Sequence, residues 1–67
     1  NSELVKTLKT YYDKGQNMNK TSKSLYVHRN TVKYRLDKIS DLIDIDINNP
    51  HNRIKLELGF LKIELNN

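Results

Sequence analysis

Apolar residues recur at helical spacing along most of this chain, and this periodicity limits the possible folds more than any other feature of the sequence. In the first segment they fall at i, i+1, i+4, i+7 and i+8 (Leu4, Val5, Leu8, Tyr11 and Tyr12). This is the pattern of an amphipathic helix. A helix over about residues 3–14 is expected, with Ser2 as its N-cap and Lys14-Gly15 at its end.

Two further helices are expected around a short turn in the middle of the chain. A brief helix capped by Asn19 should run to about Leu25, and a longer one should run from about Arg29 to Ile43. The residues between them, 26–28, would form the turn. The longer helix has a stripe for burial (Val32, Leu36, Ile39 and Ile43) and an opposite polar face (Asn30, Lys33, Tyr34 and Asp37).

The last third of the chain predicts a linker and one more helix. Residues 44–47 alternate like a strand, but four residues without a partner cannot make a sheet. We expect an extended linker that tucks Ile45 and Ile47 against the core. Asn49-Pro50 then reads as the N-cap and first residue of a helix. This helix is apolar on two sides (Ile54, Leu58, Leu61 and Leu65; Leu56, Phe60 and Ile63), which is more than three short helices can cover.

A length of 67 residues allows one small domain, and with the helical spacing it predicts an all-α domain of four to five helices that spans residues 1–67. A chain of this size buries only roughly 60% of its unfolded surface, which disfavours a deep catalytic cavity. There is no Cys, the only His residues are His28 and His51, and the only glycines are Gly15 and Gly59. Neither a catalytic triad, a metal site nor a glycine-rich phosphate loop can be assembled from these residues. We therefore expect no enzyme, no cofactor and no metal, and no apolar run is long enough to span a membrane.

Positive charge is concentrated in the middle of the chain. The whole chain carries a net charge of +4, yet residues 20–38 alone carry six Lys or Arg against one Asp. Residues 39–67 carry three Lys or Arg against five acidic residues. Basic charge gathered in one segment indicates a face that binds a polyanion such as nucleic acid.

A short helix, a tight turn and a longer helix with exposed basic residues together match a helix-turn-helix unit. In such a unit the second helix lies in the major groove of duplex DNA, and the preceding helix contacts phosphates. The residues expected at the DNA are Lys20, Thr21, Lys23, His28, Arg29, Asn30, Thr31, Lys33, Tyr34 and Lys38. His28 suits an N-cap as well as a base contact, and Arg35 suits a structural ion pair before a phosphate contact.

The string His-Arg-Asn-Thr-Val-x-Tyr-Arg-Leu at residues 28–36, with the preceding residues from Thr21, closely resembles the C-terminal helix-turn-helix of PucR/CdaR-type bacterial transcriptional regulators. The resemblance covers nearly the whole chain, from Leu4 to Asn49-Pro50 and Arg53, and the unit also looks like the DNA-binding end of Fis-type proteins. It implies a cytoplasmic DNA-binding domain whose recognition helix starts at Arg29. The chain departs from the usual pattern at two places: Tyr26 stands where helix-turn-helix motifs often have glycine in the turn, and Asp44 stands where the family has glycine after the recognition helix.

The expected partners are double-stranded DNA, a second copy of the chain in a homodimer, and an N-terminal sensor domain of the same protein. The sequence starts without Met, so we expect the C-terminal fragment of a larger regulator. One module of this size buries too little surface for tight specific binding, which favours a dimer on two half-sites. The apolar last helix could make the dimer contact or dock on the sensor. Two alternatives remain: a protein-interaction module that uses this helix, and a binder of single-stranded RNA, for which exposed aromatic residues are few.

Overall fold

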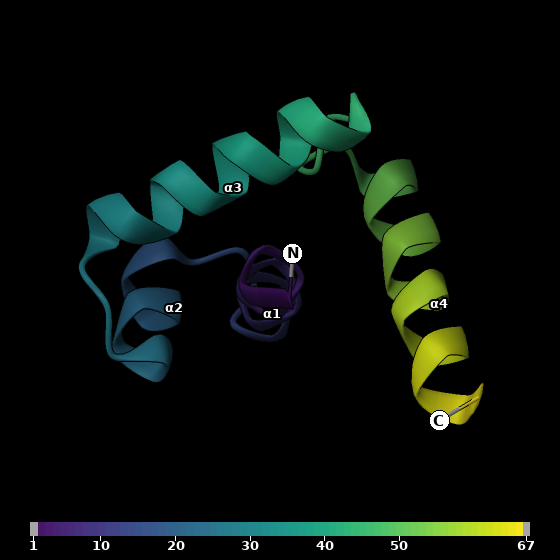
Figure 1. Cartoon of the computed structure of the whole chain (residues 1–67), viewed down its shortest axis with the longest axis horizontal. Helices are drawn as coiled ribbons and strands as arrows, with labels where there is room; N and C mark the ends of the chain where they lie inside the picture. The colour runs from purple at the N-terminus through teal and green to yellow at the C-terminus, as the bar shows by residue number, and fades with distance from the viewer. Residues whose placement is uncertain (1, 67) are drawn as a thin grey trace.

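The computed structural model describes residues 2–66 and contains four helices: α1 (Ser2–Asp13), α2 (Met18–Leu25), α3 (Arg29–Ile43) and α4 (Pro50–Asn66). Figure 1 looks along α1, which lies between α2 on one side and α4 on the other, while α3 crosses above it. The described residues form no strand. The chain is thus the small all-α domain that its periodicity predicts.

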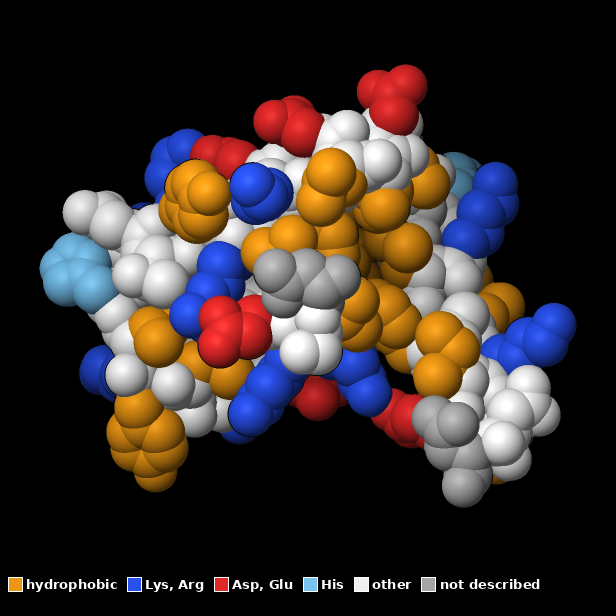
Figure 2. Space-filling model, viewed as in Figure 1, with side chains coloured by type: hydrophobic (Ala, Val, Ile, Leu, Met, Phe, Trp, Pro, Cys, Tyr) orange, Lys and Arg blue, Asp and Glu red, His pale blue; other side chains and the backbone are white. Residues whose placement is uncertain are grey.

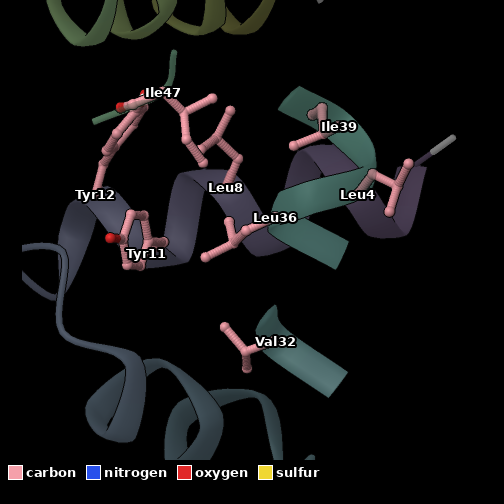
Figure 3. Packing of buried hydrophobic residues seen from close by; sticks show 8 residues of the cluster. All are labelled: Leu4, Leu8, Tyr11, Tyr12, Val32, Leu36, Ile39 and Ile47. Carbon is pink, nitrogen blue, oxygen red and sulfur yellow. The ribbon is translucent and has the colours of Figure 1, made fainter. Parts of the chain in front are cut away.

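The core forms where α3 crosses α1. Its buried apolar residues are Leu4, Leu8, Tyr11, Tyr12, Val32, Leu36, Ile39 and Ile47, and Figure 3 shows them meeting between the two helices and the linker. The prediction that Ile43 completes the buried stripe of α3 is wrong, because this side chain is 36% exposed. Leu4, in the first turn of α1, lies beside Ile39 (Figure 3), the last buried residue of α3.

The linker between α3 and α4 is tied to α1 by two tyrosines. The hydroxyl of Tyr12 donates to the carbonyl of Ile47 over 2.9 Å, and that of Tyr11 donates to Oδ1 of Asn48 over 2.9 Å. Burial raises the pKa of the Tyr12 hydroxyl above its usual value. Ile47 is buried and Ile45 is half-buried, so the expected tucking of the linker is confirmed.

The ends of the first two helices are set by residues in the left-handed conformation. Gly15 (φ 66°) and Gln16 (φ 60°) follow α1, and their N–H groups donate to the carbonyls of Tyr12 and Tyr11. This is the Schellman arrangement that glycine favours. The cap of α2 is then Asn17, whose Oδ1 accepts from the N–H of Lys20 over 2.9 Å. The prediction of Asn19 as the cap is wrong, because the helix has already begun at Met18. Ser2, the expected cap of α1, is itself the first helical residue.

One face of α4 packs on the core and the other does not. Its N-cap is Asn49, as predicted, since Oδ1 of this residue accepts from the N–H groups of His51 and Asn52 over 2.9 and 3.2 Å. Leu56 and Phe60 pack against the core cluster. None of the residues of α4 is fully buried. On the face shown in Figure 2, hydrophobic side chains gather between α3 and α4 and continue onto α4.

Arg53 joins α4 to the end of α1. Its guanidinium donates to Oε1 of Gln16 over 2.8 Å and to the carbonyl of Tyr12 over 3.2 Å, and it lies 5.1 Å from the centre of the Tyr12 ring. Near Glu57 the guanidinium Nε is 3.4 Å from the carboxylate. The side chain therefore neutralises part of the negative end of α1 while it fixes the start of α4.

Candidate nucleic-acid interface

The α2–α3 pair is held together by small buried side chains and two well-formed helix ends. Thr21 and Ser22 are buried on α2, which packs on both α1 and α3. After α2, the N–H groups of Tyr26 and Val27 donate to the carbonyls of Lys23 and Ser22, a second Schellman arrangement. α3 then starts at Arg29, with Nδ1 of His28 accepting from the N–H of Asn30 over 3.0 Å. The predicted turn at residues 26–28 and the N-cap role of His28 are confirmed.

Tyr26 occupies the position in this turn where helix-turn-helix motifs often have glycine. It adopts the left-handed conformation with φ 57° and ψ 40°, and its side chain is 95% exposed. Asp44, the second such departure, is also left-handed, with φ 53°. The turn geometry is thus retained without glycine, at the steric cost that a side chain pays in this region.

The first half of α3 presents its polar side chains to solvent. Arg29, Asn30, Lys33 and Tyr34 are exposed, and Thr31 is half-exposed. Arg29, Asn30 and Lys33 also border one shallow groove, together with Asp37 and residues of the linker. The recognition face predicted from helical spacing is therefore solvent-accessible from the first residue of α3 onward, as a helix that enters a groove requires.

Two local contacts set the electrostatics of this face. The ammonium of Lys33 lies 2.7 Å from the carboxylate of Asp37, one turn further along the helix. The ammonium of Lys38 lies 5.8 Å from the centre of the Tyr34 ring. Both contacts are exposed, so each contributes only tenths of a kcal/mol to about 1 kcal/mol and can be exchanged for a phosphate. The acidic residues Asp37, Asp41 and Asp44 lie further along α3 and at its end, where Lys38 is the one basic residue among them.

A second cationic group lies beside α2. Lys20 and Lys23 are brought together there with Lys14, from the turn after α1, around one shallow hollow. Sequence reasoning missed Lys14 as a member of this group. The signal was available, because the chain has no acidic residue between Asp13 and Asp37.

One predicted site residue does not reach the surface. The side chain of Thr21 has no exposed area, and its hydroxyl donates to the carbonyl of Asn17 over 2.7 Å. Thr21 therefore packs α2 against its neighbours and is removed from the set that can contact DNA. Arg35 is the structural residue that was expected, with its guanidinium 3.1 Å from the carboxylate of Glu3 and 3.5 Å from the hydroxyl of Thr7.

Comparison with known proteins identifies this arrangement. The family model of the PucR C-terminal helix-turn-helix domain matches residues 4–61. The chain belongs to the PucR C-terminal helix-turn-helix family. This PucR-type domain is 39% identical over 56 residues, 84% of its length, to the purine catabolism regulatory protein of Bacillus subtilis. It is 37% identical over 57 residues (85%) to the DNA-binding transcriptional activator AdeR of Bacillus subtilis and 39% identical over 56 residues (84%) to the carbohydrate diacid regulator of Escherichia coli.

The PucR-type domain spans only 10 to 14% of the length of these three relatives. No solved structure matches the chain.

Among residues 2–66, no three His, Asp or Glu side chains gather as a metal site would require. In the same part of the chain, none of the helices combines the length and apolar character needed to cross a membrane.

Proposed function

We propose that this domain binds double-stranded DNA sequence-specifically, with α3 in the major groove. The observation that carries the proposal is the presence of exposed basic residues on both helices of the α2–α3 unit. Exposed Arg29 and Lys33 lie in the first turns of α3, and Lys14, Lys20 and Lys23 surround one hollow beside α2. The names and the family of the three relatives, all regulators, support the same function.

Different side chains would perform different parts of the recognition. Arg29 and Asn30 suit base edges, because Arg makes bidentate bonds to guanine and Asn to adenine. Lys20, Lys23, Lys38 and the added Lys14 suit phosphates, which fix the position of the domain without reading sequence. Lys33, Tyr34, Thr31 and His28 complete the face, with His28 able to use only the nitrogen that does not cap α3.

We further propose that two such domains act together within a longer regulator. A single module buries too little surface for tight specific binding, and two-fold symmetric proteins read half-sites about one helical turn apart. The domain would form the C-terminal DNA-binding part of a cytoplasmic regulator whose N-terminal region senses a signal. The small share of each relative's length that the chain spans supports this organisation.

The first test measures binding to a preferred duplex, selected from a random pool, across a series of salt concentrations. The affinity should fall with a log–log slope of about −0.9 for each phosphate contacted. Single-stranded RNA of the same sequence should bind more weakly than the duplex. A flat salt dependence, or stronger binding to the single strand, contradicts the proposal.

The second test separates base reading from phosphate binding. Arg29→Ala should reduce the discrimination between selected and random duplexes by about 1–3 kcal/mol, the value of one bidentate base contact. Lys20→Ala should weaken binding to both duplexes equally and reduce the salt slope by about one phosphate. Lys55→Ala, on α4, serves as the control and should change neither. If Arg29→Ala leaves the preference intact, another residue reads the bases.

A further inference from the structure

Four apolar side chains form an exposed row along α4, which we call the outer stripe. The outer stripe consists of Ile54, Leu58, Leu61 and Leu65, whose side chains are 56, 61, 50 and 77% exposed. Their spacing of four, three and four residues is the heptad spacing of the a and d positions in a coiled coil. A contiguous apolar row of this kind marks an interaction surface on a small domain.

The outer stripe is distinct from the face by which α4 packs on its own domain. That inner face is made by Arg53, Leu56 and Phe60, which contact the end of α1 and the core. At 100° per residue the centres of the two faces lie roughly 140° apart, a little more than a third of a turn. A second helix can therefore pack on the outer stripe while α4 keeps its internal contacts.

The charges beside the outer stripe specify which kind of helix fits it. Lys55 and Lys62 occupy the e positions on one side, and Glu57 and Glu64 occupy the g positions on the other. In a parallel pair, a g residue faces the e residue five positions later on the partner helix, so Glu57 of one copy meets Lys62 of the other. In an antiparallel pair, Glu would face Glu and Lys would face Lys, which is unfavourable.

Both glutamates already have a cationic partner within the domain. Glu57 lies 3.4 Å from the guanidinium of Arg53, and its side chain is still 43% exposed. Glu64 is paired with Lys9 of α1 and is 54% exposed. Each glutamate thus keeps exposed area for a second cation while it contacts a cation of its own domain.

We propose that α4 pairs in parallel with α4 of a second copy of this chain, through the outer stripe and two Glu57–Lys62 contacts. The inference builds on the proposed pairing of two modules, and its test uses no DNA, so it can hold or fail independently of DNA binding. Because the seam has only four apolar residues per copy, the isolated domain should associate at high protein concentration and dissociate on dilution.

The orientation is tested by disulfide cross-linking, for which a chain without native cysteine is well suited. In the parallel pair Leu65 faces its own counterpart, so Leu65→Cys alone should cross-link under mild oxidation. In an antiparallel pair Leu65 would face Ile54, and only a mixture of Leu65→Cys and Ile54→Cys proteins would cross-link. Ile63→Cys is the matched control, because Ile63 is 59% exposed on the same helix but lies outside the outer stripe. Equal cross-linking of the control and of Leu65→Cys, or cross-linking in the mixture alone, overturns the proposal.

The association itself is tested by sedimentation of the whole chain over a concentration series. The native chain should pass from monomer to dimer, and Leu58→Asp should remain monomeric while Ile63→Asp still dimerises. Lys62→Glu should weaken the dimer by placing Glu against Glu57, and mixing it with Glu57→Lys protein should restore association. Circular dichroism confirms that each variant is folded. A native chain that stays monomeric at millimolar concentration, or equal loss in both aspartate variants, contradicts the inference.

Discussion

Tyr26 adopts a backbone conformation that normally belongs to glycine. A side chain in the left-handed region costs roughly 1–2 kcal/mol, and replacing it by glycine removes this cost. Part of the resulting gain in stability is lost, because glycine has more conformational freedom in the unfolded chain. The side chain of Tyr26 is almost fully exposed, so little packing is lost when it is removed. Replacing Tyr26 by glycine should therefore remove the backbone strain at this position.

We expect Tyr26→Gly to raise the free energy of unfolding by about 0.5–1 kcal/mol, as measured by urea denaturation. The control is Ser24→Gly, two residues earlier inside α2, which should lower stability by about 0.5–1 kcal/mol because helix interiors disfavour glycine. If Tyr26→Gly instead lowers the free energy of unfolding, the exposed ring stabilises the fold and the expectation is wrong.

Individual residues show which parts of this structure can be predicted from local sequence. His28 and Asn49 cap their helices as predicted, because each precedes a clear run of helical spacing. Asn17 and Asn19 are both good caps, and the choice between them depends on the left-handed pair Gly15-Gln16, which places Asn17 at the helix start. Thr21 lies near the start of α2 beside Lys20, a position that predicts a DNA contact, and only the packing of α2 shows that its side chain is buried.

Arg53, in the first turns of α4, connects this helix to the end of α1. It anchors the first turns of α4 to the carbonyl end of α1 through Tyr12 and Gln16. Charge-assisted hydrogen bonds of this kind are worth more than neutral ones. The attachment of α4 therefore depends heavily on one side chain.

We expect Arg53→Met to lower the free energy of unfolding by about 1–2 kcal/mol, since hydrogen bonds to a charged group are lost while apolar volume is kept. Arg29→Met is the matched control: it removes an exposed arginine from the start of α3, where a cation is slightly unfavourable, and should be neutral or slightly stabilising. Chemical denaturation of both variants makes the comparison, and equal effects would show that Arg53 contributes no more than a surface charge.

The helices themselves were largely predictable, whereas their mutual contacts were not. The bounds of α3 follow from its apolar stripe and its capped start, and the structure confirms them at Arg29–Ile43. The contacts of Arg53 join residues 37 and 41 positions apart, and no local pattern encodes such a pairing. For Lys14 the sequence does offer a signal, the absence of acidic residues between Asp13 and Asp37, but its meeting with Lys20 and Lys23 at one hollow is seen only in the fold.

The distribution of charge over the whole domain restricts how it can approach DNA. Cations cover the start of α2 and the first half of α3, while Asp37, Asp41 and Asp44 follow on α3 and its end. Asp37 lies at the border between these regions, where it engages Lys33. It should therefore oppose the binding of a phosphate backbone.

We expect Asp37→Asn to raise the affinity for duplex DNA by roughly threefold to fivefold, the effect of removing about 1 kcal/mol of repulsion between charges near contact distance in water. The effect should shrink as salt is added. Asp13→Asn removes the same charge from the groove between α1 and α4 and should change affinity less. Equal gains in the two variants would assign the effect to net charge rather than to position.

The central place of α1 has a consequence for how the chain acquires its structure during synthesis. The residues that cover Leu8 and Tyr12 come mainly from α3 and from Ile47 of the linker. A ribosome makes the chain from its N-terminus, so α1 emerges with its apolar face bare and must wait for more than thirty further residues. Nascent chains stalled before Ile47 leaves the exit tunnel should be cleaved readily by protease within α1, and those stalled after α4 emerges should resist.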